Sequence, residues 1–285
     1  MGAVHAHCGV SRAHAGRGAH SPGHGADCVH GLIGSGLVTG AGQAERARPQ
    51  PVVVSWSGGK DSTLMLERLL HDEHVVVRAL LTTVSTVYDR VSIHGVRRSI
   101  LRAQAASLGL PLFEVALGAH ASNEDYEAAF ARGVQQLEAA YPDTRCLAFG
   151  DLFLEDVRAY REAMLARLGW RGLYPLWGEE TGALARYFVQ RGYEATLTCV
   201  DTQQLDGAFA GRRYDGALLD ALPATVDRCG ERGEFHTCVT GGPIFDRPIA
   251  VATGERVLRD ERFQYCDLVE VPPGPAGREA AGAGA

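Results

Sequence analysis

The stretch Ser57-Gly58-Gly59-Lys60-Asp61-Ser62 lies between two segments of different periodicity. The apolar run before it, residues 52–56, is typical of a short buried strand, and residues 63–70 carry apolar side chains at helical spacing. A glycine-rich turn between a strand and a helix N-terminus points backbone N–H groups toward an anion. We therefore predict a phosphate-binding loop, against the simpler alternative of a glycine turn that only starts a helix.

Lys60 is the only lysine in the chain, and every other basic Lys+Arg position is arginine. Arginine serves as a general surface cation, but it cannot replace lysine as a compact point charge inside a tight loop. Lys60 is suited to neutralise phosphates, Asp61 to orient Mg²⁺ or its waters, and Ser57 and Ser62 to donate hydroxyl hydrogen bonds. The loop is neither a Walker A sequence nor a G-x-G-x-x-G fingerprint.

Strand-like and helix-like segments alternate after the loop. Strands are predicted at 75–82, 112–115 and 146–149, and helices at 96–108, 123–140 (with Asn123 as cap) and 155–168. This alternation predicts an α/β fold with a doubly wound, mostly parallel sheet covered on both faces. Ligands of such sheets bind beyond the carboxyl ends of the strands. Four residues at those ends are therefore expected to converge with the loop: Thr82, Thr83, Gly150 and Asp151.

The pattern changes near residue 172. A helix at 181–191, a strand at 195–200 and a glycine-rich segment at 229–237 follow. We predict a nucleotide-binding domain over residues 50–171 and a second, smaller α+β lobe over 172–271. The tails, 1–49 and 272–285, are rich in Gly and Ala and are predicted to be disordered. The histidines of the first tail match no defined metal site.

Composition and charge argue against several classes of protein. The net charge of −6 disfavours a nucleic-acid partner, and no apolar run reaches the roughly 18–20 residues that a membrane helix needs. The N-terminus shows no secretory signal, and none of the seven cysteines forms a C-x-x-C pair. We expect reduced thiols and a cytoplasmic location.

Several motifs together resemble a known enzyme family. The Ser57–Ser62 loop after a strand resembles the signature of the PP-loop ATP pyrophosphatases, which have a Rossmann-like fold and cleave ATP between the α and β phosphates. Residues 51–271 as a whole resemble the diphthine–ammonia ligase family of these enzymes. The resemblance rests on the segment 230–237, similar to Gly-Glu-x-Gly-Glu-Phe-x-Thr, and on a middle block at 150–153, 158–162 and 175–177.

The resemblance implies an ATP-dependent, amide-forming ligase. Such an enzyme adenylates an acceptor carboxylate and releases pyrophosphate, and ammonium then displaces AMP. The product in this family is diphthamide, on a modified histidine of elongation factor 2. Carried to this chain, residues Ser57, Gly58, Gly59, Lys60, Asp61, Ser62, Thr82, Thr83, Gly150 and Asp151 would bind ATP, with Mg²⁺ at Asp61. No glutamine-hydrolysing domain is visible, so free ammonium would supply the nitrogen.

The acceptor side is implied to include Glu231, Glu234 and His236, with Gly233 and Thr237 binding substrate. These residue types suit the reaction, because ammonium must be held and must lose a proton before it attacks. The alternative is a rigid turn whose acids pair with arginines such as Arg228 and Arg232.

Two residues around the start of the helix predicted at 96–108, His94 and Arg97, could bind ATP phosphates or the acceptor carboxylate. The alternative is that both are solvated at the start of that helix.

Other functions stay open at this point. The acceptor could be protein-bound diphthine or a small carboxylate, and Arg228 and Arg232 favour an anionic one. Cys229 and Cys238, which flank the glutamates, raise the alternative of sulfur transfer to tRNA. A third reading is an ATP-binding sensor without catalysis. The sequence leaves the choice between monomer and homodimer open.

Overall fold

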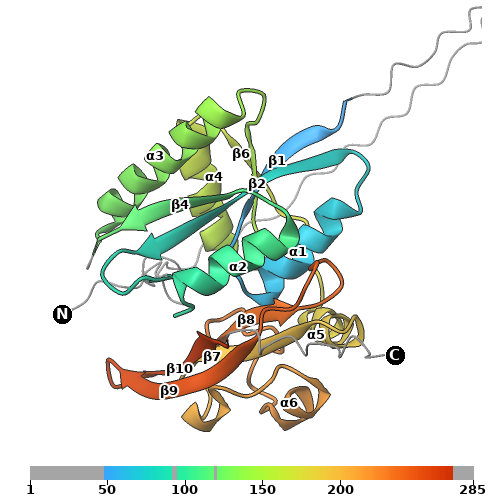
Figure 1. The fold of residues 1–285 in the computed structure, drawn as a ribbon, viewed down its shortest axis with the longest axis vertical. Coiled ribbons are helices and arrows are strands. Elements are labelled where there is room, and N and C mark those ends of the chain that lie inside the picture. Colours follow the sequence, from blue (N-terminus) through green and yellow to red (C-terminus); the bar gives the residue numbers. More distant parts are fainter. Residues whose placement is uncertain (1–47, 92–94, 119–120, 272–285) are drawn as a thin grey trace, which may run out of the picture.

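The computed structural model describes residues 48–91, 95–118 and 121–271. These ranges leave out His94, residues 1–47 of the N-terminal tail and all of the C-terminal tail. The structure therefore does not test the disorder predicted for the two tails. The described chain forms two sheets stacked as two lobes (Figure 1).

The first sheet contains five parallel strands and one short antiparallel strand. Its strands are β1 (Gln50–Ser55), β2 (Val75–Ser85), β3 (Arg90–Val91), β4 (Leu112–Leu117), β5 (Cys146–Ala148) and β6 (Arg171–Leu173). The parallel strands pair in the order β4-β2-β1-β5-β6, and β3 pairs antiparallel with the end of β2. The strand order therefore reverses between β1 and β5, and the predicted mostly parallel sheet is confirmed.

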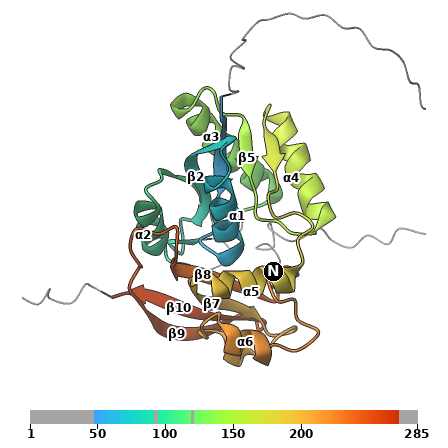
Figure 2. The same cartoon turned by 90° about the vertical axis from the view of Figure 1, so that its right-hand side faces the viewer.

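Helices cover both faces of this sheet (Figures 1 and 2). They are α1 (Lys60–Leu70), α2 (Arg98–Leu108), α3 (Asn123–Ala140) and α4 (Glu155–Arg167). Side chains alternate along β1, so Val52 and Val54 join the core under α1 and α2, whereas Val53 joins the core under α3 and α4. A central strand buried on both faces explains the apolar run that precedes the loop.

Two element ends show how local chemistry sets the boundaries. Gly109 ends α2 in the left-handed conformation, with φ of 66°, as the glycine there predicted. Ser122, not the predicted Asn123, caps α3: its hydroxyl accepts the N–H of Asp125, whose carboxylate accepts the N–H of Ser122. This reciprocal capping box satisfies two backbone donors at the start of the helix.

The second lobe carries a four-stranded antiparallel sheet in the order β8-β7-β10-β9. Its elements are α5 (Thr181–Gln190), β7 (Glu194–Asp201), the 3₁₀ turn η1 (Gly207–Phe209), α6 (Gly216–Ala221), β8 (Phe235–Gly241), β9 (Val251–Arg259) and β10 (Phe263–Glu270). This lobe confirms the predicted smaller α+β part.

The two lobes share one hydrophobic core. Trp56 and Leu64 of the first lobe belong to the same buried cluster as Leu197 and Phe235 of the second. Within the described residues, none of the helices is both long enough and apolar enough to cross a membrane. The loop at residues 57–62, between β1 and α1, lies at the junction of the two lobes, because Val239 of β8 donates its N–H to the carbonyl of Gly58.

Candidate active site

A cavity of about 210 Å³ lies over the carboxyl ends of β1, β2 and β5, where the strand order reverses. Three groups of predicted residues line it together. They are Ser57, Gly59, Lys60, Asp61 and Ser62 of the loop, Thr82, Thr83, Gly150 and Asp151 at the strand ends, and Glu231, Gly233, His236 and Thr237 of the second lobe. The structure thus brings motifs from both lobes to one place.

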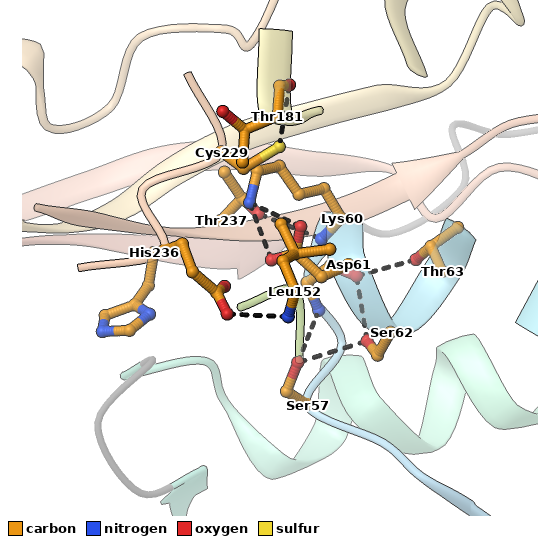
Figure 3. Close-up of polar contacts among 12 residues, drawn as sticks. Ser57, Lys60, Asp61, Ser62, Thr63, Leu152, Thr181, Cys229, His236 and Thr237 are labelled. Atoms are coloured by element: carbon orange, nitrogen blue, oxygen red, sulfur yellow. Dashed lines mark hydrogen bonds and ion pairs between the residues drawn. The ribbon is translucent and has the colours of Figure 1, made fainter. Parts of the chain in front are cut away.

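The loop is held in one shape by its own side chains (Figure 3). The hydroxyl of Ser57 accepts the N–H of Gly59 at 3.2 Å, and the hydroxyl of Ser62 donates to the carbonyl of Gly59 at 2.9 Å. Gly58 has a φ of +77°, and a Cβ there would lie 2.6 Å from Oε1 of Gln104. Only glycine fits at this position without strain.

Strand β8 of the second lobe also holds the loop. Oγ1 of Thr237 accepts the backbone N–H of Lys60 at 3.1 Å, and the carbonyl of Gly58 accepts the N–H of Val239 at 2.8 Å. Gln104 donates to the carbonyls of Gly58 and Val239 at 3.0 and 2.6 Å. Thr237, predicted to bind substrate, therefore supports the phosphate loop in the structure.

The ammonium group of Lys60 is buried, with 3% of its side chain exposed. Its Nζ lies 2.9 and 2.7 Å from the two carboxylate oxygens of Asp61 and 5.7 Å from the ring centre of Phe235. Burial is the largest single effect and lowers the pKa of Lys60, but the neighbouring groups, led by the Asp61 carboxylate, together raise the pKa above its ordinary value. Lys60 is charged at neutral pH and faces the cavity as a cation.

Glu231 is the acid of the second lobe that lines the cavity. Its Oε1 accepts the N–H of Leu152 at 2.8 Å. Burial, assisted by the nearby Asp61 carboxylate, raises the pKa of Glu231 to about 8. A carboxyl group that titrates near neutrality can take up and release a proton during a reaction.

Glu234 does not line the cavity, unlike the prediction. It is 2% exposed, and its two oxygens accept the backbone N–H groups of Asp227 and Arg232, each at 2.9 Å. Of the arginines considered as partners in the alternative, Arg228 donates to the carbonyl of Leu222, and the guanidinium of Arg232 lies 5.8 Å from the ring centre of Phe153. Glu234 braces the turn that carries Glu231.

His236 stands at the start of β8 and lines the cavity. Its imidazole points away from Lys60 and Asp61 (Figure 3). His236 therefore borders a different part of the cavity from the phosphate loop.

Arg97 lies outside the cavity, contrary to its predicted substrate contact. Its guanidinium donates to both carboxylate oxygens of Asp267 on β10, and Arg90 donates to the same carboxylate at 2.6 Å. The pairing joins the two lobes. His94, predicted with it, is outside the described residues.

Among the charged residues that line the cavity, Arg161 was not predicted from the sequence. Arg161 of α4 lines the cavity, with Nε 2.8 Å from Oδ2 of Asp151 and its guanidinium 4.4 Å from the ring centre of Phe149. The resembling block 158–162 contained it, and Leu154, Val157 and Arg161 face the cavity at helical spacing. The spacing shows that these three residues share one face of the helix. The sequence does not show that this face meets the cavity, so Arg161 could not be singled out.

The two cysteines near the glutamates are not suited to sulfur transfer. Cys229 is 2% exposed and donates to the carbonyl of Thr181 at 3.3 Å, and burial raises its pKa far above the ordinary value. Cys238 is fully buried, which raises its pKa to about 12. Thiol chemistry needs an accessible thiolate, so this arrangement weighs against the tRNA alternative.

Comparison with known proteins finds similarity in both lobes. Residues 50–172 match the family described as "Diphthamide synthase N-terminal domain", and residues 180–270 match "Diphthamide synthase C-terminal domain". A protein of Schizosaccharomyces pombe named "Diphthine--ammonia ligase" is 25% identical over 228 residues. That match covers 74% of this chain and 38% of the yeast protein, so the chain spans well under half of its relative's length.

Proposed function

This chain belongs to the diphthamide synthase family, and on that premise we propose that it is an ATP-dependent ligase that forms an amide from a carboxylate and ammonium. The proposed acceptor is protein-bound diphthine on elongation factor 2, because the yeast relative is named diphthine–ammonia ligase. A small carboxylate is the competing acceptor, and the test below separates the two.

One observation carries the proposal. The phosphate loop and the acid Glu231 of the second lobe are far apart in the sequence, but they line the same cavity. A reaction that joins a nucleotide to a second substrate needs both halves in one place, because positioning supplies much of the rate enhancement.

The loop is the proposed seat of the ATP phosphates. It supplies the positive charge of Lys60, the hydroxyls of Ser57 and Ser62, and the N-terminus of α1. Thr82 and Thr83, which lie within the last four residues of β2, would lie along the nucleoside. Thr82 is consistent with this, since its buried hydroxyl has no hydrogen-bond partner among the described residues and lines the cavity.

The residues present fit a Mg²⁺ ion carried by the phosphates. Among the described residues, no group of three or more His, Cys, Asp or Glu side chains could hold a metal. Mg²⁺ at phosphate sites typically takes one or two carboxylates and completes its shell with phosphate and water oxygens, and Asp61 supplies such a carboxylate. When bound, the ion would neutralise charge on the phosphates.

The proposed chemistry has two bond exchanges. An acceptor carboxylate oxygen bonds to the α-phosphorus while the bond from that phosphorus to the bridging oxygen breaks, and pyrophosphate leaves. Ammonia then bonds to the acyl carbon, and the bond from that carbon to the AMP oxygen breaks. Glu231 would take the proton that ammonium must lose, because its pKa of about 8 lies near neutrality.

The test separates nucleotide products after incubation with ATP, Mg²⁺ and ammonium. One arm contains diphthine-bearing elongation factor 2, one a metabolite extract, and one no acceptor, each repeated with Lys60→Ala. AMP and pyrophosphate in the elongation-factor arm support the proposal. AMP in the extract arm alone moves the acceptor to a small carboxylate, and AMP in no arm favours a nucleotide sensor.

A further inference from the structure

The charged side chains of the cavity form two separate pairs. Among the described residues that line it, the side chains with a permanent positive charge are Lys60 and Arg161. Lys60 pairs with Asp61, and Arg161 pairs with Asp151. One pair belongs to the phosphate loop, so the other is available for a second anion.

The two cations reach the cavity from opposite faces of the parallel sheet. Lys60 begins α1, which packs with α2 on one face, whereas Arg161 lies on α4, which packs with α3 on the other (Figures 1 and 2). In a displacement at phosphorus, the attacking and leaving oxygens lie roughly in line on opposite sides of the phosphorus. With pyrophosphate on the α1 side, the attacking carboxylate belongs on the other side.

The guanidinium of Arg161 is held in place by two neighbours, Asp151 and Phe149. The Arg161 side chain is 17% exposed, and its guanidinium carbon lies over the ring of Phe149, 4.4 Å from the ring centre. Nε of Arg161 lies 2.8 Å from Oδ2 of Asp151, and Nη2 of Arg161 donates to Oδ1 of Asp151 at 3.3 Å. The pairing with Asp151 involves Nε and one N–H of Nη2, and the edge formed by Nη1 and the other N–H of Nη2 has the shape that a carboxylate needs for a bidentate pair.

The other arginines considered for an anionic acceptor are committed elsewhere. Arg97 pairs with Asp267 at the lobe junction, and Arg228 donates to the carbonyls of Leu222 and Pro223. The guanidinium of Arg232 lies 5.8 Å from the ring centre of Phe153, and none of these three arginines lines the cavity.

We propose that Arg161, oriented by Asp151 and Phe149, binds the carboxylate of the acceptor and presents it for adenylation. The inference rests on the proposed function and names the residue that selects an anionic acceptor. Tyr126 lies beside it in the lining, and burial raises the pKa of that phenol to about 12, so it stays protonated near the anion.

The test compares Arg161→Gln, Arg161→Lys and the control Arg158→Gln in the full chain. Arg158 is also on α4, but its guanidinium lies 4.7 Å from the ring centres of both Tyr174 and Trp177, outside the cavity lining. Two quantities are measured: the KM for diphthine-bearing elongation factor 2, and the Kd of the non-cleavable analogue α,β-methylene-ATP. Thermal unfolding checks that each variant is folded. If Arg161→Gln does not fold, Arg161→Lys is the variant in which both quantities are measured.

Arg161→Gln is expected to raise the acceptor KM at least about tenfold while the analogue Kd stays within about twofold, because a charge-assisted bidentate contact is lost from one substrate only. Arg161→Lys should fall between wild type and Arg161→Gln, since it restores the charge without the fork. The control should match wild type.

Two results overturn the inference. An unchanged acceptor KM in Arg161→Gln removes the carboxylate contact, and an analogue Kd weakened about tenfold assigns Arg161 to a nucleotide phosphate instead. A wild-type chain that forms no AMP contradicts the proposed function separately. The analogue titration then still decides whether Arg161 belongs to the nucleotide.

Discussion

The hydroxyl of Thr237 accepts the backbone N–H of Lys60 at 3.1 Å, although 177 positions separate the two residues. This hydrogen bond ties the N-terminus of α1 to strand β8 of the second lobe. Both residues line the cavity, so the second lobe shapes the Ser57–Ser62 loop as well as the part of the cavity that contains Glu231.

We predict that Thr237→Val weakens nucleotide binding. Valine keeps the shape of threonine but leaves the N–H of Lys60 without its acceptor, which costs about 1–2 kcal/mol, or roughly 5- to 30-fold in the Kd of α,β-methylene-ATP. Thr240→Val is the matched control, because Thr240 lies on the same strand and its hydroxyl donates to Glu194, away from the loop. Equal Kd values for the two variants in a calorimetric titration would remove this role from Thr237.

Lys60→Arg is expected to abolish AMP formation almost as fully as Lys60→Ala. The ammonium group is 3% exposed and fits between Asp61 and the ring of Phe235, and the larger planar guanidinium cannot take its place. Loss of one charge-stabilising group in an active site typically costs about 10²–10³ in rate. Pyrophosphate release is the measurement, and wild-type rates in Lys60→Ala would contradict the loop assignment.

The two glutamates of the second lobe should separate by phenotype. Glu231→Gln keeps the acceptor for the N–H of Leu152 but cannot take a proton, so amide formation should fall while the Tm stays near that of wild type. Glu234→Gln replaces one of the two oxygens that hold the turn with an amide donor, so it should lower stability by about 1–3 kcal/mol. The measurements are amide yield by mass spectrometry and thermal unfolding. The opposite assignment of the two phenotypes would reverse these roles.

Asp267 is expected to make stability depend on pH in the acid range. Burial raises the pKa of this carboxyl, but hydrogen bonds from Arg97 and Arg90 outweigh burial and lower the pKa to about 2 from its ordinary 3.8. A depressed folded-state pKa stabilises the protein above the unfolded pKa, and that contribution, about 2 kcal/mol, is lost as pH falls from about 4 to about 2.

Chemical unfolding of wild type and Asp267→Asn at pH 7, 4 and 2 tests this. The difference in unfolding free energy between them should be largest at pH 7 and should shrink between pH 4 and pH 2. Glu114, whose pKa is also about 2 beside Arg98 and Arg102, titrates equally in both proteins and cancels in the difference. A difference that does not change with pH would show that the carboxylate's charge is not what joins the lobes.

Local sequence patterns were enough to predict most strands and helices of the first lobe. The apolar run of β1, the glycine turn and the helical spacing of α1 are neighbours in the chain, so their periodicity suffices to predict them. Parallel strands end at one edge, which is why Thr82, Gly150 and the loop could be predicted to meet. The three-residue β6 was too short to show a period. The hairpin of β9 and β10 was missed because its turn takes positive φ at Asp260 and Glu261, where the usual glycine or asparagine signal is lacking.

The sequence by itself determined which chemical groups this protein offers: one lysine in a glycine-rich loop, a carboxylate after a strand, and two glutamates in a turn of the second lobe. Tertiary structure decided which partner each group meets. Arg97 and Asp267 stand 170 positions apart, and Glu234 spends both oxygens on backbone N–H groups of its own turn. A motif fixes the type of donor or acceptor, but a hydrogen bond forms only within about 3 Å, and only the packing of the two lobes sets such distances.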